Sequence, residues 1–221
     1  MAMHVTSAGA HQGAAVRQAG VPLERARAVG ILLHGRGARA ESILELAHAV
    51  NVEGMAWLAP QAAGNAWYPN RFIAPIASNE PWLSSALAAV GDLVTQVEAA
   101  GIDSTKILLG GFSQGACLAL EYVVRHPARF GGVAGLSGGL VGPPGTTWPT
   151  TGTLAGTPVF LGCSDVDFHI PKERVIESAD VLTALGANVE TVLYPNMDHI
   201  INDDELAHVG RMVEGLVGSA K

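Results

Sequence analysis

The feature that most constrains the fold is an alternation of short apolar runs with stretches of helical spacing. The runs are bounded by Gly, Pro or His and read as buried strands; they are Val29–Leu33, Met55–Leu58, Lys106–Leu109, Gly132–Leu136, Pro158–Leu161 and Val189–Tyr194. Between them, apolar residues recur three or four positions apart, as helices require. Parallel neighbours need crossover connections, so we expect an α/β fold with a mostly parallel central sheet and helices on both faces.

Length and composition indicate one domain. The chain has 221 residues, of which 48% are hydrophobic and 15% charged, enough to fill a single large core. We expect one domain over residues 1–221, with the Gly/Ala-rich residues 1–20 as a poorly ordered arm. Two stretches, Gly64–Asn79 and Gly138–Gly156, carry Gly, Pro and Thr in place of a regular pattern, and we expect loops there.

Charge and cysteine content exclude several classes of partner. A net charge of −7 without a Lys/Arg run argues against nucleic-acid binding. Cys117 and Cys163 form neither a disulfide framework nor a metal-ligand pattern, so we expect no metal and a reducing compartment. The start of the chain lacks a signal-peptide pattern, and no apolar run approaches the roughly 18 residues of a membrane span. These features predict a cytoplasmic protein.

A nucleophile motif follows the third expected strand. Residues Gly111-Phe112-Ser113-Gln114-Gly115 read G-x-S-x-G and lead directly into a helical run. In α/β-hydrolases this motif is a sharp strand-to-helix turn that exposes the serine hydroxyl, and its glycines avoid clashes with neighbouring backbone. The alternative is a tight turn whose serine caps a helix. Because an apolar strand and an amphipathic helix flank the motif, we interpret Ser113 as a catalytic nucleophile of the α/β-hydrolase fold.

A serine nucleophile needs a histidine base and a carboxylate that orients it, in the chain order Ser, Asp or Glu, His. His199 follows the last strand and is the predicted base, whereas His208 lies inside the last helical stretch and His126 comes too early in the chain. Asp165 and Asp167 both follow the Pro158–Leu161 strand, and spacing alone does not separate them. Asp198 adjoins the histidine and reads as a solvated carboxylate.

These residues resemble the bacterial phospholipase/carboxylesterase family, which includes acyl-protein thioesterases and is related to dienelactone hydrolases. The resemblance spans roughly residues 29–217. It is carried by motifs in a fixed order: Leu33-His34-Gly35-Arg36-Gly37, Ala59-Pro60-Gln61, Trp67-Tyr68-Pro69, the G-x-S-x-G motif, Asp167 to Pro171, and Asp198-His199.

The resemblance selects Asp167 over Asp165, because the family carries an aspartate four residues before a proline, here Pro171. Two positions depart from the family pattern: Phe168 stands where proline is usual, and Asp198 where glycine is frequent. Members often pair through exposed apolar surface, so the resemblance allows a homodimer. It implies no cofactor and a small-molecule ester as substrate.

The remaining predicted site residues would stabilise the oxyanion or contact the substrate. The residue after the nucleophile, Gln114, is one expected oxyanion donor through its backbone N–H, and the resemblance assigns the second to Arg36. Trp67, Tyr68 and Phe72 are expected as apolar walls, with a role in covering the sheet edge as the alternative.

Three further residues, Leu140, Val141 and Trp148, could form a partial lid, although simple packing is the favoured interpretation. Cys117 reads as a small buried hydrophobe.

The sequence is compatible with three functions. The leading hypothesis is a serine carboxylesterase that hydrolyses small esters through an acyl-serine intermediate. Thioester or lysophospholipid cleavage uses the same chemistry on longer acyl chains. A ligand receptor without turnover is the alternative from another class, because a fold does not determine a function.

Overall fold

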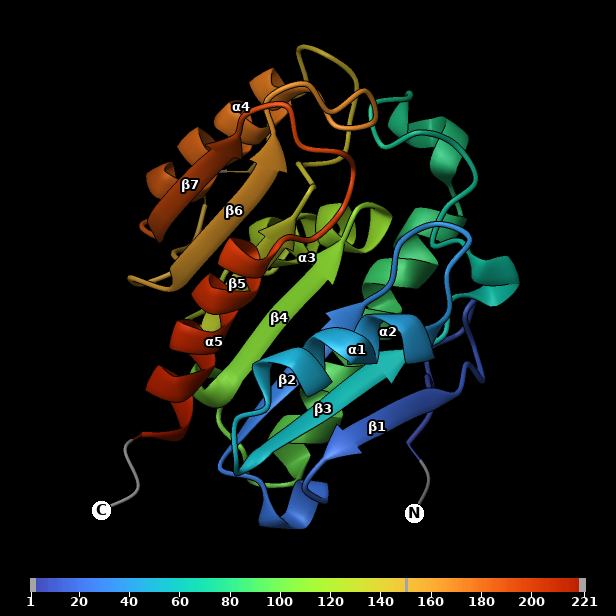
Figure 1. The fold of residues 1–221 in the computed structure, drawn as a ribbon. Coiled ribbons are helices and arrows are strands. Elements are labelled where there is room, and N and C mark those ends of the chain that lie inside the picture. The colour runs from blue at the N-terminus through green and yellow to red at the C-terminus, as the bar shows by residue number, and fades with distance from the viewer. Residues whose placement is uncertain (1–2, 150, 219–221) are drawn as a thin grey trace.

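In the computed structural model, which describes residues 3–149 and 151–218, a seven-stranded sheet runs through the centre of the molecule (Figure 1). Its spatial order is β1-β3-β2-β4-β5-β6-β7. The strands are Val16–Gly20 (β1), Ala28–Leu33 (β2), Met55–Pro60 (β3), Ile107–Phe112 (β4), Gly132–Leu136 (β5), Pro158–Ser164 (β6) and Asn188–Tyr194 (β7). β2 to β7 pair in parallel, and β1 pairs antiparallel with β3, so the predicted mostly parallel sheet is confirmed.

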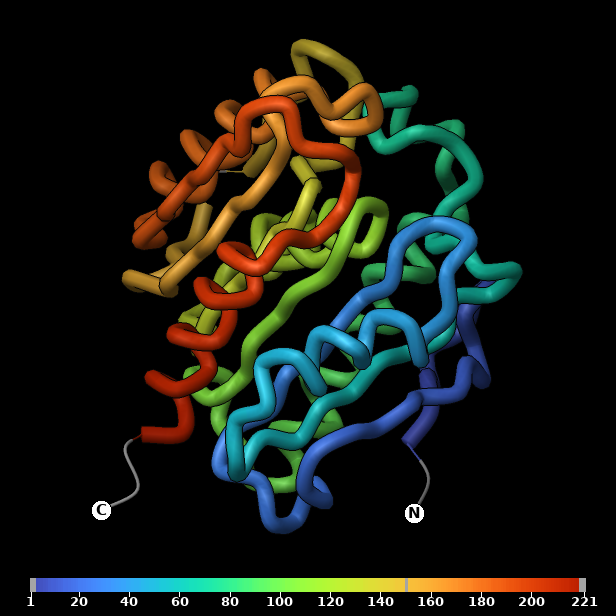
Figure 2. The backbone as a smooth tube through the Cα atoms, viewed as in Figure 1, coloured from blue at the N-terminus to red at the C-terminus, as the bar shows by residue number. Residues whose placement is uncertain are grey.

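Helices cover both faces of the sheet, and the path of the chain between them can be followed in Figure 2. Helices α1 and α5 pack on one face around Leu32, Trp57 and Leu108, whereas α2, α3 and α4 pack on the other around Ile31, Leu58 and Leu109. Alternate residues of one strand therefore serve opposite cores. The helices are Ala40–Val50 (α1), Trp82–Ala99 (α2), Gln114–Arg125 (α3), Lys172–Ala184 (α4) and Asp203–Val217 (α5).

The central strands are buried on both faces, which explains their continuous apolar sequences. Short 3-10 helices occupy parts of the connections: Leu23–Arg25 (η1), Ala63–Asn65 (η2), Ile76–Asn79 (η3) and Ser104–Lys106 (η4). Two of them, η2 and η3, lie within the predicted loop of residues 64–79 or at its start. Within the described ranges, no helix combines the length and apolar character that crossing a bilayer requires.

Residues 3–20 differ from the poorly ordered arm that their composition predicts. Val16–Gly20 pairs with β3 over its whole length. Upstream, Val5 is buried, and the carboxylate of Asp92 accepts hydrogen bonds from the backbone N–H groups of Thr6 and Ser7. β1 lies at the edge of the sheet and is held by backbone pairing with β3. It therefore lacks the continuous apolar run from which the central strands were predicted. Residues 1 and 2 lie outside the described residues.

Candidate active site

Ser113, the predicted nucleophile, lies at the sharp turn between β4 and α3. Its φ of 55° and ψ of −120° are rare for a residue with a side chain. The turn is held against the next strand because the N–H of Ser113 donates a hydrogen bond to the carbonyl of Leu136 (2.9 Å). Such strain persists only where the surroundings enforce it, and here it presents the serine at the carboxyl edge of the sheet.

The two glycines of the motif are required by the backbone of β2. A Cβ at Gly111 would lie 2.6 Å from the carbonyl oxygen of Leu33, and a Cβ at Gly115 would overlap the same carbonyl. Backbone atoms of a central strand cannot move aside as a flexible side chain can. The close approach of α3 to β2 therefore depends on glycine at both positions.

Substituting Gly115→Ala is expected to lower the free energy of unfolding by about 2–4 kcal/mol, because the new methyl group forces α3 away from β2. Gly215→Ala is the matched control, since a Cβ at that helical position meets nothing within 4 Å. The control should raise stability by about 0.5–1 kcal/mol through helix propensity. Urea unfolding followed by circular dichroism measures both, and equal stabilities for the two variants would contradict the steric account.

Three side chains from different loops meet beside this turn. Ser113 Oγ lies 2.9 Å from His199 Nε2, and His199 Nδ1 lies 2.6 Å from Asp167 Oδ2. With the tautomer that places a proton on Nδ1, the ring donates to the carboxylate and accepts from the serine hydroxyl. The carboxylate is fully buried and the imidazole 17% exposed. The structure thus brings together the serine, histidine and aspartate that the sequence singled out.

Asp167 is held by more than the histidine. Its Oδ1 accepts hydrogen bonds from the backbone N–H groups of His169 (2.8 Å) and Ile170 (3.1 Å). Burial alone raises the pKa of this carboxyl, but the hydrogen bonds from His199, Ile170 and His169 outweigh burial, and the pKa lies below its usual value. The group is therefore an anion at neutral pH.

The other acid candidate, Asp165, does not reach the histidine ring. Its Oδ1 accepts a hydrogen bond from the backbone N–H of Asn196 (2.8 Å), which ties the loop after β6 to the loop that carries His199. Asp198 is exposed. Of the remaining histidines, His208 stacks on Phe160 and His126 packs on the ring of Tyr122.

The loop that carries His199 ends in a capping box. Asn202 Oδ1 accepts from the N–H of Glu205 (2.8 Å), and Glu205 Oε2 accepts from the N–H of Asn202 (2.9 Å). Glu205 is fully buried, and its Oε1 has no hydrogen-bond partner among the described residues. Burial raises the pKa of this carboxyl to about 7.

Because burial raises the pKa of Glu205, we expect the free energy of unfolding to fall as pH rises. In the unfolded chain Glu205 titrates near its ordinary pKa of 4.5, so between that pH and about 7 the folded state binds the extra proton. The free energy of unfolding should therefore decrease by about 2–3 kcal/mol from pH 5 to pH 8. Glu205→Gln keeps the capping hydrogen bonds and should flatten this dependence. Urea titrations at several pH values test it, and an unchanged slope in the variant would assign the effect to another group.

The two predicted oxyanion donors face the same space as Ser113. Arg36 and Gln114 both line the cavity beside the serine, and neither backbone N–H has a hydrogen-bond acceptor within the described part of the chain. Their side chains are occupied elsewhere: Arg36 donates to the carbonyls of Pro69 (2.8 Å) and Asn70 (2.5 Å), and the Gln114 amide donates to the carbonyl of Tyr68 (2.8 Å). The side chains thus anchor the loop after β3, while the N–H groups stay open.

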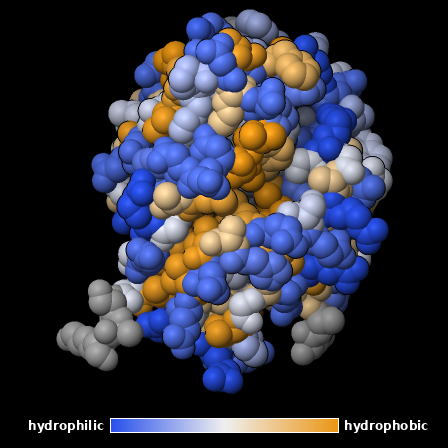
Figure 3. Space-filling view, viewed as in Figure 1, coloured by the Kyte–Doolittle hydropathy of each residue, from blue (hydrophilic) through white to orange (hydrophobic). Residues whose placement is uncertain are grey.

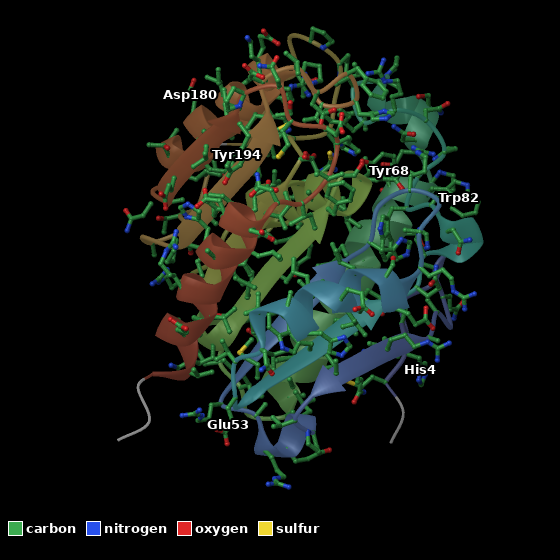
Figure 4. All side chains as sticks on the ribbon, viewed as in Figure 1. His4, Glu53, Tyr68, Trp82, Asp180 and Tyr194 are labelled. Carbon is green, nitrogen blue, oxygen red and sulfur yellow. The ribbon has the colours of Figure 1, made fainter. Side chains whose placement is uncertain are left out.

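A cavity of about 300 Å³ opens beside the serine. The space-filling view is hollowed near its centre, where hydrophobic side chains gather close to the end of β4 and the loop between β7 and α5 (Figure 3). Two of the predicted wall residues line the cavity, Tyr68 (Figure 4) and Phe72. The lining also contains residues for which the sequence predicted no role in the site, among them Arg71, Phe112, His169 and Ile170. Each of these four adjoins a residue that the motifs singled out.

Trp67 is the exception among the predicted wall residues, because it does not line the cavity. Its indole is fully buried, and Nε1 donates to the carbonyl of His34 (2.9 Å), while its backbone N–H donates to Gln114 Oε1 (2.9 Å). The expectation of a substrate wall is wrong for this residue. Its hydrogen bonds instead fix the loops that carry the two predicted oxyanion donors.

The stretch 138–156 contributes no described residue to the cavity lining. Leu140 and Val141 are buried, and Glu121 Oε2 accepts hydrogen bonds from the N–H of Val141 and the indole of Trp148. Packing therefore accounts for these residues without a lid. Cys117 is also buried, and burial raises the pKa of its thiol to about 12. Among residues 3–149 and 151–218, no group of three or more His, Cys, Asp or Glu side chains could hold a metal ion.

Known proteins resemble the chain in sequence and in fold. Residues 14–216 match the phospholipase/carboxylesterase family. A crystal structure of a phospholipase/carboxylesterase from Dyadobacter fermentans superposes with a TM-score of 0.85 at 41% identity, covering 90% of this chain and 95% of that one.

Curated relatives share part of their length with the chain. Acyl-protein thioesterase 1 of Saccharomyces cerevisiae is 30% identical over 142 residues, which cover 61% of this chain and 60% of the relative. A rice protein named probable inactive carboxylesterase is 28% identical over 148 residues, covering 65% of this chain and 60% of that protein. The alignments thus span about three fifths of these relatives. The family match and the Dyadobacter structure show that the chain belongs to the phospholipase/carboxylesterase family of hydrolases and has the α/β-hydrolase fold.

Proposed function

We propose that the protein is a serine carboxylesterase that hydrolyses small carboxylic esters through an acyl-serine intermediate, without a cofactor. The observation that carries this proposal is the continuous hydrogen-bonded series from Ser113 through His199 to Asp167, with distances of 2.9 and 2.6 Å. A strained serine, an imidazole and a buried anion, hydrogen-bonded in this order, are the parts that acyl transfer needs.

In the first half of the reaction, Ser113 Oγ attacks the ester carbonyl while His199 Nε2 takes the hydroxyl proton. Asp167 keeps the other ring nitrogen protonated and stabilises the imidazolium that forms. The oxygen of the tetrahedral intermediate becomes negative, and the open N–H groups of Arg36 and Gln114 would bind it. Each such donor lowers the barrier by roughly 3–4 kcal/mol. The imidazolium then protonates the departing alcohol, which leaves the acyl group on the serine.

In the second half, water replaces the alcohol. His199 takes a proton from the water as it attacks the acyl carbonyl, and then returns that proton to Ser113 Oγ as the acid leaves. The exposed edge of the imidazole allows water to reach it, because the ring is 17% solvent-accessible.

The cavity favours a short acyl chain. Its volume of about 300 Å³ is at the lower end of ordinary small-molecule sites, and Tyr68 and Phe72 supply apolar walls. Thioester cleavage is the second candidate, supported by the name of the yeast relative, and the same residues could perform it. The rice relative's name keeps a scaffold without turnover among the outcomes of the test. A cytoplasmic location, a homodimer and a single domain over the whole chain stay predictions.

A fluorophosphonate probe and an acyl-chain series test the proposal together. The probe should label Ser113 in the native protein, and peptide mass spectrometry should find no label in Ser113→Ala. Hydrolysis of p-nitrophenyl esters should be fastest for acetate to butyrate and should fall about tenfold or more toward dodecanoate, because the long chain exceeds the cavity. Preference for long-chain thioesters would favour the second candidate, and absence of both labelling and turnover would favour the scaffold.

A further inference from the structure

The cavity beside Ser113 is cationic although the protein is acidic. Arg36 and Arg71 line it, and no Asp or Glu is among its described lining residues. Neither arginine forms an ion pair within residues 3–149 and 151–218, whereas the chain as a whole carries a net charge of −7. An unpaired charge that lines a cavity of an oppositely charged protein creates a local field that attracts anions.

The guanidinium of Arg36 is held in place before any ligand arrives. Its two terminal nitrogens donate to the carbonyls of Pro69 and Asn70, which uses two of its five N–H donors. Because these hydrogen bonds already fix the Arg36 side chain, it loses less conformational entropy when a ligand binds. Its other N–H groups can donate to an anion.

Arg71 spans the space between two loops of the site. Its backbone carbonyl accepts from the amide of Asn79 (3.2 Å), a fully buried residue that fixes this segment. Its side chain makes one long hydrogen bond, from Nη2 to the carbonyl of His169 (3.4 Å), on the loop that carries Asp167. A single long hydrogen bond to a neutral carbonyl leaves the guanidinium free to exchange it for a carboxylate, with which it forms stronger, paired bonds.

Apolar side chains form most of the cavity wall. Phe72, Phe112 and Ile170 line the cavity together with Tyr68, whose hydroxyl is buried beside the thiol of Cys117. The cavity as a whole therefore combines apolar walls with two cations.

We propose that the site selects esters that carry a carboxylate a few bonds from the scissile carbonyl, such as the half-ester of a short dicarboxylic acid. Arg71 and Arg36 bind the carboxylate, and the apolar walls accept the methylene groups. This inference rests on the proposed esterase function and adds the class of substrate.

Matched carboxylate and carboxamide substrates test it. The first comparison is of monoethyl glutarate with ethyl glutaramate, where the carboxylate lies on the acyl side of the ester. The second is of 4-butanoyloxybenzoate with 4-butanoyloxybenzamide, where it lies on the alcohol side. In one of the two pairs, kcat/KM should be at least about tenfold higher for the carboxylate, with most of the difference in KM. The preference should shrink as NaCl rises from about 20 to about 500 mM.

Two variants distinguish a direct contact with Arg71 from the effect of removing any positive charge. Arg71→Gln should reduce the carboxylate-to-amide ratio about tenfold. Arg39→Gln is the matched control, because Arg39 is exposed, pairs with Glu41 and lies outside the cavity lining; it should leave the ratio unchanged. In the native protein, glutarate should inhibit competitively and its diamide should not, which tests the inference even where a variant fails to fold.

Two outcomes would overturn the inference: equal or better turnover of the amide in both pairs, or an equal loss on both members of a pair in Arg71→Gln. If p-nitrophenyl butyrate is still hydrolysed and Ser113 is still labelled in that case, the esterase function stands and only the substrate class is wrong. If neutral esters are not hydrolysed and the serine is not labelled, the proposed function fails and the inference fails with it.

Discussion

Ser113→Ala is expected to lower kcat/KM for p-nitrophenyl butyrate by at least about 10⁴-fold, because the variant lacks the hydroxyl that would form the acyl intermediate. His199→Ala should lose a similar factor, since Ser113 Oγ then lacks the base that lies 2.9 Å away. The double variant should be scarcely worse than either single variant, because the two side chains act as one unit. Steady-state kinetics on freshly purified proteins measure all three.

Ser137 provides the matched control for this loss. It follows β5 as Ser113 follows β4, has a φ of 49°, and its hydroxyl is buried beside the thiol of Cys163. Ser137→Ala should retain activity within about twofold, because it removes a similar atom that touches no reacting group. A Ser113→Ala enzyme with wild-type turnover would exclude the acyl-serine mechanism outright.

Asp167→Asn is expected to lower kcat by about 10³–10⁴-fold with a small change in KM. The backbone N–H groups of His169 and Ile170 hold one side-chain oxygen of residue 167, so the amide NH2 of the variant would face His199 Nδ1 and donate to it. The histidine is then left in the wrong tautomer, and its charged form loses its counter-ion. The low pKa of Asp167 means that the carboxylate is already ionised throughout the neutral range, so the loss should persist across that range.

Asp165→Asn is the control for the acid. This residue accepts a hydrogen bond from the backbone of Asn196, and an amide oxygen can still do so, so kcat should fall by less than about tenfold. The two carboxylates lie on the same loop, two positions apart. Equal losses in the two variants would contradict the assignment of distinct roles to them.

The sequence predicted those elements whose pattern is local. Each central strand is an unbroken apolar run because both of its faces are covered, and the structure places β2 to β7 within a few residues of the predicted runs. The predicted strand over residues 106–109 extends to Phe112, since the G-x-S-x-G turn begins inside the strand. β1 was missed because Val16–Gly20 carries mostly polar or small side chains and depends on backbone pairing with β3, whereas β7, the opposite edge strand, retains an apolar run.

The local sequence pattern does not predict which of two neighbouring residues faces the cavity. Trp67 and Tyr68 look equally suited to a substrate wall, yet one is buried against His34 and the other lines the cavity. Arg71 was overlooked because an arginine in a loop is ordinarily a solvated charge. Its place beside the cavity depends on the loop after β6, where the carbonyl of His169 accepts a hydrogen bond from its side chain.

By itself, the sequence determined the layered sheet, the strained turn at Ser113 and the order of the candidate acid and base along the chain, because each follows from residue spacing within a single segment. The tertiary structure alone decided which aromatic residues face the cavity and that two arginines share it. It also placed Asp167 against His199, a choice that residue spacing left open and that the family resemblance had selected. These depend on where loops from different strands end in space. That position is set by contacts between residues far apart in the chain, such as Arg36 with Asn70 and Asp165 with Asn196.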